Sequence, residues 1–337
     1  MNKKITVSAP GKLMLLGEHA VVYNHPCLVT AINQRMRVTI ETLSVQEFQL
    51  YAADVQVVGY KKSLSTIGRG DIPKGARFVE IALKNVFDCI NHTYPKKALR
   101  YNPFETGIQV TTTSEFSSQF GFGSSSASTV SVVKAVSALL GLSLSQKEIF
   151  DLSYQTVLDI QGTGSGFDIA AAVYGGTLYF VTGGKSIQQL PIDTLPLVIG
   201  YSGIKADTGE RMAFVKEKFA SHIARLEEIY QAIEILVNKA KEACIALDFA
   251  QVGRCMNDNQ KLLRELGVSI PKLDTMVASA LSAGAYGAKL SGAGGGDCMI
   301  ALVAPEKRNA VMKAIQAAGG KVLPGIPNAE GVRIENI

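Results

Sequence analysis

Hydrophobic and polar residues follow both strand-like and helix-like periods along this chain. Alternation or short apolar runs indicate strands at 4–8, 36–42, 108–113, 177–181, 197–200, 320–323 and 331–335, with one more after the glycine-rich turn that ends at residue 297. Apolar residues at helical spacing indicate helices at 78–91, after residue 124, and at 146–160, 209–247, 248–266, 270–284 and 305–318. The mixture predicts a loop-rich fold that contains both helices and sheets.

Composition agrees with a folded chain. Of 337 residues, 47% are hydrophobic and 19% are charged, and the length is sufficient for two domains. A turn-rich passage at 183–196 places the expected boundary near residue 190, so that the domains would span 1–190 and 191–337. The formal net charge of +5 is too small to indicate nucleic-acid binding.

Cysteine usage and the absence of long apolar runs indicate the compartment. The five cysteines form no CxxC pair, and their odd number argues against a disulfide framework, so we expect a reducing cytosol. The first residues lack the apolar run of a signal peptide, and no stretch of 18 uncharged apolar residues occurs. We therefore expect a cytoplasmic protein that has no membrane contact.

The stretch Gly121-Phe122-Gly123-Ser124-Ser125-Ser126 is the strongest candidate for phosphate binding. The two glycines permit positive φ angles, and the serines enter a helix. A glycine turn that leads into a helix gathers unpaired N–H groups and the positive end of the helix dipole, and this arrangement suits an anion. Serine hydroxyls add donors and a ligand for Mg²⁺. The alternative is a serine-capped helix after a flexible turn.

Charged residues in apolar or small-residue surroundings mark two further segments. Residues 9–23 place Lys12, Glu18 and His19 where a charge is costly without a partner, which favours a functional pocket. Alternatively, Lys12 snorkels and the other two residues satisfy a turn. The glycine-rich run before Asp168 presents one carboxylate at the tip of a turn, although this aspartate could simply cap the apolar segment 169–174.

Two loops remain ambiguous at this level. Residues 60–77 form a basic loop that would cover a nucleotide or be solvated. The loop 291–297 is flexible enough to wrap phosphates, or it is a tight turn between strands. Neither the GxxxxGK[ST] pattern nor GxGxxG after a strand is present, so another kind of phosphate site is expected.

Three motifs in order resemble those of the GHMP small-molecule kinases. They are Pro10-Gly-Lys-Leu with Gly17-Glu-His-Ala-Val, then Gly121-Phe-Gly-Ser-Ser-Ser, then Lys289-Leu-Ser-Gly-Ala-Gly-Gly-Gly-Asp. Within that superfamily the likeness is strongest to mevalonate kinases, through Gly17–Tyr23, Gly203-Ile-Lys and the run 266–302. The resemblance implies an α+β fold with an N-terminal domain similar to ribosomal protein S5 domain 2, a ferredoxin-like C-terminal domain, and an active site between them.

The same resemblance implies roles for individual residues. ATP would lie with its phosphates over 121–126, and the loop with Gly294 and Gly295 would close on them. Asp168 would be the catalytic base and Lys12 its charge partner, both beside the substrate hydroxyl. Glu18 and His19 would border the acceptor site, which for this family takes mevalonate. Ser125 would bind Mg²⁺. A homodimer is one option for assembly.

One residue departs from the pattern. Mevalonate kinases place a magnesium-binding glutamate eleven residues before the aspartate, and this chain has Val157 there. Asp159 lies about 200° further around a helix, so it cannot replace that ligand without a shift in backbone or register. The runs 120–126 and 164–176 also resemble phosphomevalonate kinase, which is therefore the alternative activity. A GHMP-fold sensor without catalysis is a third option, although retention of Lys12 with Asp168 argues against it.

Overall fold

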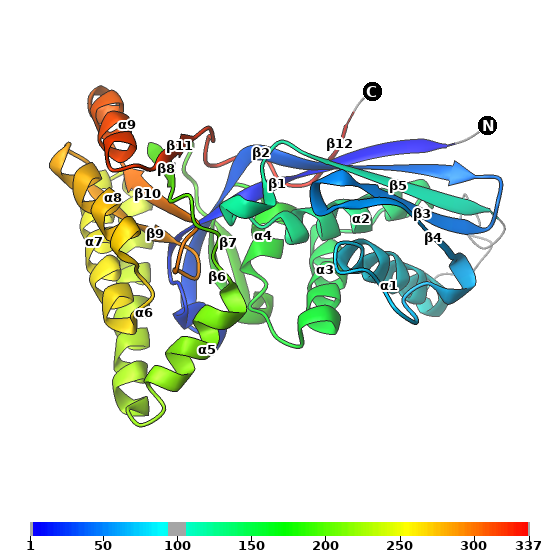
Figure 1. Cartoon of the computed structure of the whole chain (residues 1–337), viewed down its shortest axis with the longest axis horizontal. Coiled ribbons are helices and arrows are strands. Elements are labelled where there is room, and N and C mark those ends of the chain that lie inside the picture. The colour runs from blue at the N-terminus through cyan, green and yellow to red at the C-terminus, as the bar shows by residue number, and fades with distance from the viewer. Residues whose placement is uncertain (1–2, 94–105, 336–337) are drawn as a thin grey trace.

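The computed structural model describes residues 3–93 and 106–335, which form two β-sheets with helices packed against each (Figure 1). The first sheet has eight strands in the order β12-β1-β2-β5-β3-β4, and β6 pairs with both β2 and β7. Its strands are β1 (Lys4–Leu16), β2 (Pro26–Leu43), β3 (Glu47–Ala52), β4 (Val57–Ser63), β5 (Gly107–Ser114), β6 (Thr177–Val181), β7 (Ser186–Gln189) and β12 (Arg333–Ile334).

Four helices lie together beside this sheet in Figure 1. They are α1 (Arg77–Thr93), α2 (Ser124–Leu139), α3 (Gln146–Gln161) and α4 (Phe167–Tyr174). The central helix is α2, which contacts β1, β2, α1, α3 and α4. Most of its side chains are buried, and small residues such as Ala127 and Ser131 let its neighbours approach on all sides. A helix surrounded in this way is held rigidly, and its first turn carries the candidate phosphate site.

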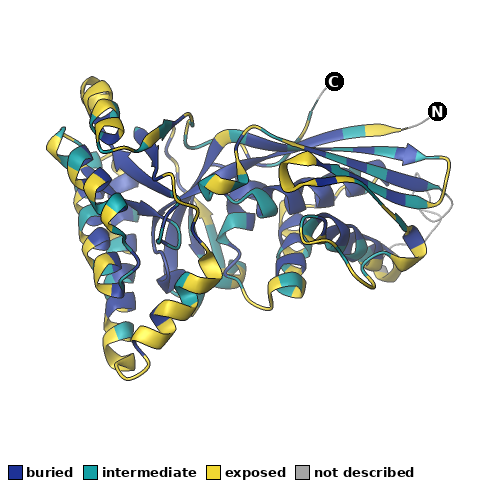
Figure 2. Cartoon of the chain, viewed as in Figure 1, coloured by how far each residue is buried: buried dark blue, intermediate teal, exposed yellow. Residues whose placement is uncertain are grey.

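The second sheet has four antiparallel strands in the order β11-β8-β10-β9. These are β8 (Leu197–Tyr201), β9 (Gly287–Ser291), β10 (Cys298–Leu302) and β11 (Lys321–Leu323), accompanied by α5 (Thr208–Lys218), α6 (Ile223–Ile245), α7 (Phe249–Leu266), α8 (Pro271–Ser282) and α9 (Arg308–Ala317). The strand order 4-1-3-2 is that expected for the ferredoxin-like domain. Figure 2 shows buried residues along the strands and exposed residues on the outer faces of these helices.

The observed secondary structure differs from that predicted by the periodicity in several places. The strands β1 and β2 are longer than predicted, so Lys12 lies within a strand. The strands β3, β4 and β7 were not predicted, and β7 lies in the passage that was expected to be turn-rich. The single helix expected at 209–247 is two helices, because the chain turns at 219–222, where Phe219 packs into the core. No glycine or proline marks that turn, so the local sequence carries no signal for it.

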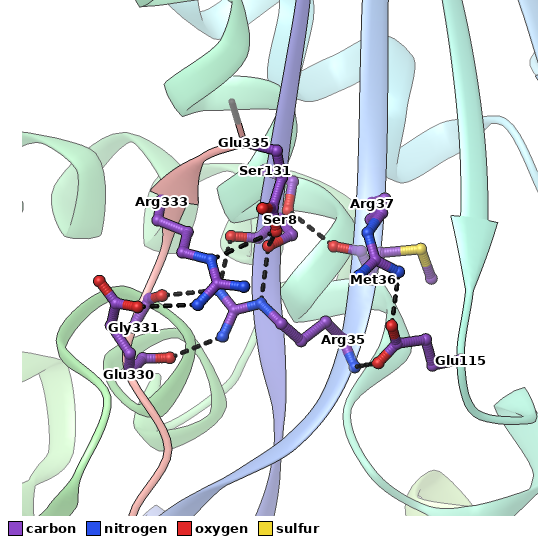
Figure 3. Close-up of polar contacts among 10 residues, drawn as sticks. All are labelled: Ser8, Arg35, Met36, Arg37, Glu115, Ser131, Glu330, Gly331, Arg333 and Glu335. Carbon is purple, nitrogen blue, oxygen red and sulfur yellow. Dashed lines mark hydrogen bonds and ion pairs between the residues drawn. The ribbon is translucent and has the colours of Figure 1, made fainter. Parts of the chain in front are cut away.

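The C-terminal segment returns to the first sheet and is held there by Arg35 (Figure 3). The buried guanidinium donates to Ser8 Oγ at 2.6 Å, to the Glu330 carbonyl at 2.9 Å and to the Gly331 carbonyl at 2.7 Å. Strand β12 pairs with β1. The domain boundary near residue 190 stays a proposal. The segment that carries β12 comes after that boundary in the chain, but it lies with the first sheet.

Candidate active site

Strand β1 delivers Lys12 directly to the phosphate turn. The strand has a bulge between Pro10 and Gly11, and the Lys12 N–H donates to the carbonyl of Phe122 at 2.9 Å. A Cβ atom on Gly11 would lie 3.1 Å from that carbonyl oxygen, so glycine permits the close approach. The first and second motifs are therefore joined by a backbone hydrogen bond.

The phosphate turn has the geometry that its glycines predict. Gly121 and Gly123 have φ angles of 72° and 77°, and α2 begins at Ser124. Gly123 is the N-cap and provides no side-chain hydrogen bond to the helix. The first N–H groups of a helix have no intrahelical acceptor, so this end is suited to an anion. Ser124 and Ser125 are partly exposed there, whereas Ser126 is buried.

Lys12 and Asp168 face each other beside this turn. Lys12 Nζ lies 3.9 Å from Asp168 Oδ1, and the Lys12 side chain is 10% exposed against 31% for Asp168. A Cβ on Gly123 would lie 3.2 Å from Lys12 Cε and 3.7 Å from Asp168 Oδ2. The positive φ of Gly123 and the close approach of Lys12 together favour glycine at this position. Asp168 is the second residue of α4 and not its N-cap, which is Gly166.

The environment of Asp168 suits a proton acceptor. Its Oδ1 atom is buried and accepts no hydrogen bond from the part of the chain that the structure describes. Burial raises the pKa of the Asp168 carboxyl above its usual value, and the Lys12 ammonium opposes that rise. The carboxylate is thus more basic than an exposed aspartate, and the Lys12 ammonium favours its ionised form.

The glycine-rich loop 291–297 connects β9 and β10 of the second sheet and lies against the phosphate turn. Asp297 Oδ2 would be 2.6 Å from a Cβ on Gly121, so the two loops touch. Gly294 and Gly295 have φ angles of 80° and 75°, and a Cβ on Gly294 would lie 2.2 Å from the Val268 carbonyl oxygen. Ser291 Oγ bonds to both the N–H and the carbonyl of Met14, at 3.0 and 2.9 Å, and thereby ties this loop to β1.

His19 also bonds to the third loop. Its Nε2 lies 2.9 Å from the Ala293 carbonyl oxygen, and the carbonyl can only accept, so Nε2 carries the proton. His19 Nδ1 is then an acceptor, and it is buried without a partner among the residues described. Burial lowers the pKa of His19, so the ring is neutral at physiological pH. This nitrogen is available to a hydroxyl donor.

Glu18 has a partner that the sequence did not reveal. Its carboxylate forms an ion pair with Lys289 Nζ, and both side chains are essentially inaccessible, at 1% and 0% exposure. Asn259 Nδ2 donates to the second oxygen of Glu18 at 3.3 Å. The Glu18 charge is therefore neutralised within the interface between the two halves, instead of facing the acceptor. Lys289 belongs to the third motif, but motif order alone does not show which residue it meets.

The predicted departure at Val157 has a structural counterpart. Val157 is buried, and Asp159 is committed elsewhere: its Oδ2 accepts from Asn85 at 2.8 Å and its Oδ1 from Gln155 at 2.7 Å. Over residues 3–93 and 106–335, no three His, Cys, Asp or Glu side chains cluster closely enough to hold a metal. Ser125, partly exposed at the phosphate turn, is an oxygen donor that fits a Mg²⁺ ion taking most of its ligands from phosphate and water.

Two features of the site have no counterpart in the sequence analysis. One is Arg211 in the first turn of α5, whose Cδ would be 2.7 Å from a Cβ on Gly295, and which forms no ion pair within the described chain. The other is a cavity of about 430 Å³ beside the start of α2. Its lining includes Asp54, Gln56, Lys74, Gly75, Phe78 and Ser125.

Comparisons with known proteins agree with this geometry. Family models for "GHMP kinases N terminal domain" and "GHMP kinases C terminal" match residues 82–176 and 240–321, and a "Galactokinase galactose-binding signature" matches residues 1–42. A mevalonate kinase of Thermococcus onnurineus is 37% identical over 99% of both chains.

Solved structures share the fold over nearly the whole chain. The mevalonate kinase of Methanococcus jannaschii has a TM-score of 0.78 at 26% identity and covers 99% of each chain. The phosphomevalonate kinase of Streptococcus pneumoniae, in complex with phosphomevalonate and AMPPNP, has a TM-score of 0.78 at 19% identity over 96% of this chain and 99% of that one. The second likeness shows the fold alone. The chain belongs to the GHMP kinase family and, by full-length similarity, to its mevalonate kinases.

Proposed function

We propose that this protein transfers the γ-phosphoryl group of ATP to the primary hydroxyl of mevalonate. The observation that carries the proposal is the Lys12–Asp168 pair, which lies against Gly123 at the start of α2. A phosphate bound to that helix start would be next to a carboxylate that can accept a proton. Phosphoryl transfer to an alcohol uses a base next to a phosphate site in this way.

Asp168 and Lys12 have complementary tasks in this reaction. Asp168 accepts the proton of the attacking hydroxyl, and its raised pKa makes it a better acceptor. Lys12 stabilises the negative charge that develops on the oxygen as the proton leaves. Positioning of the two substrates supplies much of the rest of the catalysis, because phosphoryl transfer demands little covalent chemistry from the protein.

The nucleotide has a site that runs from the cavity to the phosphate turn. The cavity that Asp54, Gln56 and Lys74 help to line would take the nucleoside, and it is continuous with Ser124 and Ser125. The N–H groups of the first turn of α2 would then bind the phosphates. Ser125, with the phosphates themselves, would hold Mg²⁺, which neutralises phosphate charge when bound.

The acceptor needs a cation for its carboxylate and partners for its hydroxyls. Arg211 is a cation beside the third loop that has no ion-pair partner in the described chain, so it suits a carboxylate. The Nδ1 atom of His19 accepts a hydrogen bond from a hydroxyl. These partners suit mevalonate, a hydroxylated carboxylate.

Phosphomevalonate is the alternative acceptor, and the balance of charges disfavours it. Compared with mevalonate, phosphomevalonate carries a phosphate group with about two negative charges, and binding this group requires more cations or N–H donors. Lys12 is paired with Asp168 and Lys289 with Glu18, so neither ammonium group is left to balance the added phosphate. We therefore expect kcat/KM for mevalonate to exceed that for phosphomevalonate by at least about tenfold, or roughly 1.4 kcal/mol.

The test is an acceptor panel. Mevalonate, phosphomevalonate, galactose and homoserine are each supplied with saturating ATP and Mg²⁺, and phosphorus NMR locates the new phosphate. Phosphorylation of mevalonate at its primary hydroxyl supports the proposal. A preference for phosphomevalonate would replace it with the alternative activity, and tight ATP binding without ADP release would point to a sensor.

A further inference from the structure

Glu80 is a charged side chain with no accessible surface, located in the first turn of α1. All three of its resolved partners come from the chain that precedes the helix. Lys62 Nζ donates to Oε1 at 2.7 Å, the Gly68 N–H donates to the same oxygen at 2.8 Å, and the Tyr60 hydroxyl donates to Oε2 at 2.9 Å. A buried carboxylate is tolerated only when paired in this way, so these contacts hold together as a unit.

These bonds anchor the basic segment 60–77, which the sequence left as either a nucleotide cover or a solvated loop. Lys62 Nζ also donates to the Arg69 carbonyl, so one cation bonds to the loop and to α1. Gly68 has a φ of +73°, and a Cβ there would lie 2.3 Å from Lys84 Cδ. The loop is therefore folded back against α1 at its middle, with Glu80 as the fixed point.

The residues that precede Glu80 in the chain line part of the nucleotide cavity. Phe78 and Val79 immediately precede Glu80 and line the cavity, as do Lys74 and Gly75 at the end of the loop. Gly75 has no room for a side chain, since a Cβ would be 2.6 Å from the Val55 carbonyl oxygen. Ser124 and Ser125 contribute to the same cavity. The width of the cavity thus depends on how the loop and the first turn of α1 are held.

We propose that Glu80 is a positioning residue for the nucleotide: by bonding to Tyr60, Lys62 and Gly68, it holds Lys74 and Gly75 as the cavity wall opposite the phosphate turn. The inference rests on the proposed function only in assigning this cavity to ATP. Glu80 itself is buried behind the wall and touches no substrate. Its loss should therefore weaken nucleotide binding while leaving the acceptor site intact.

The test compares Glu80→Gln with Asp88→Asn. Gln keeps the shape but removes the negative charge that pairs with Lys62, and it replaces one acceptor oxygen with a donor, so at least one of the three bonds is lost or must reverse its direction. Asp88 is a matched control because it lies on the same helix, also pairs with a lysine, and is 52% exposed. The affinities for ATP and ADP are measured by calorimetry, and KM is measured for ATP and for mevalonate.

We expect Glu80→Gln to raise Kd and KM for ATP at least about fivefold, with KM for mevalonate within about twofold of the parent and Asp88→Asn unchanged. Lys74→Met should give a similar selective rise, and the two changes together should be less than additive. Equal rises in both KM values, or normal ATP affinity with only a lower Tm, would overturn the inference.

The test can still be made if Glu80→Gln does not fold or if the parent enzyme does not phosphorylate mevalonate. If Glu80→Gln does not fold, Tyr60→Phe and Lys62→Met each remove one donor and leave the carboxylate in place, and the same selective loss of ATP affinity is expected. Binding of ATP is measured without an acceptor. A parent enzyme that binds ATP but does not phosphorylate mevalonate would therefore contradict the proposed function, and the comparison of ATP affinities would still test Glu80.

Discussion

At the scale of single residues, the chemistry depends on one carboxylate and one ammonium group. Asp168 Oδ1 faces Lys12 Nζ at 3.9 Å, too far for a hydrogen bond, and receives no other donor from the described residues. An acceptor atom left without a donor is costly in a protein interior. A substrate hydroxyl would supply that donor, so the arrangement is ready for the proton that catalysis must move.

Asp168→Asn should retain ATP binding and lose most turnover, because the amide keeps the shape and cannot accept the proton. The loss of a general base typically lowers kcat by about 10²–10⁴-fold. Kinetics and ATP calorimetry measure the two effects separately. Asp159→Asn is the control, since that carboxylate bonds to Asn85 and Gln155 and should leave kcat unchanged. A near-normal kcat for Asp168→Asn would remove Asp168 from the mechanism.

The pH dependence of kcat/KM should reflect the ionisation of Asp168 beside Lys12. The base must be ionised, so kcat/KM should fall as the pH drops through the raised pKa of Asp168, at a higher pH than the usual value of about 3.9. Lys12 lowers this pKa, so Lys12→Met should move the acidic limb to higher pH in addition to slowing the reaction. Profiles of kcat/KM against pH for both proteins measure the shift. An acidic limb that stays in place, or moves to lower pH, would show that another group titrates.

At the scale of elements, the strands and helices around α2 fix its position. The helix is packed between β1, β2 and three other helices, so its first turn is presented at a fixed place. Gly123 leaves that end without a side-chain cap, and Lys12 approaches it through a backbone hydrogen bond to Phe122. A capping side chain would have competed with the phosphate for the same N–H groups.

Ser125→Ala should raise the concentration of Mg²⁺ required for half-maximal rate more than it raises KM for mevalonate, because the hydroxyl is the proposed metal ligand in this turn. Val157→Glu should lower that requirement, since α3 would then carry a carboxylate at the position where the family pattern expects a magnesium-binding glutamate. Titrations of rate against Mg²⁺ at saturating ATP measure both. If neither variant changes the titration, the metal is held by other groups.

At the scale of the whole molecule, the two halves are joined through the motifs themselves. The Glu18–Lys289 pair, the Ser291–Met14 bonds and the His19–Ala293 bond all connect the first motif to the third. Arg35 adds a second connection, because it holds the C-terminal segment on the first sheet (Figure 3). Among the helices that the structure describes, none is long and apolar enough to cross a membrane.

Glu18→Gln should destabilise the protein strongly, because it leaves the Lys289 ammonium buried without a countercharge. Breaking a buried pair typically costs about 3–5 kcal/mol. Chemical denaturation measures the loss, and the double variant Glu18→Gln with Lys289→Met should recover part of it. Glu18 was expected to border the acceptor site, but Lys289 already neutralises its charge. The ratio of kcat/KM between mevalonate and phosphomevalonate should therefore change little in Glu18→Gln.

The sequence by itself determined the parts of the site that depend on local residue types. Glycines at 121 and 123 predicted positive φ angles and an uncapped helix start, and both are present. The resemblance to GHMP kinases implied that Lys12, Asp168 and the phosphate turn would meet, and the structure brings them together. Periodicity predicted most helices, because each element buries one face of its own sequence.

Only the tertiary structure decided which charges are paired and which are free. Glu18 and Lys289 are 271 residues apart in the chain, so no local pattern could show that they neutralise each other. The same holds for Arg211 beside Gly295 and for Arg35 with the C-terminal segment. Glu80 is an acid in the first turn of α1, and burial with partners distant in the chain makes it the anchor of a loop. The energy of a charge depends on its surroundings, and folding alone supplies those surroundings.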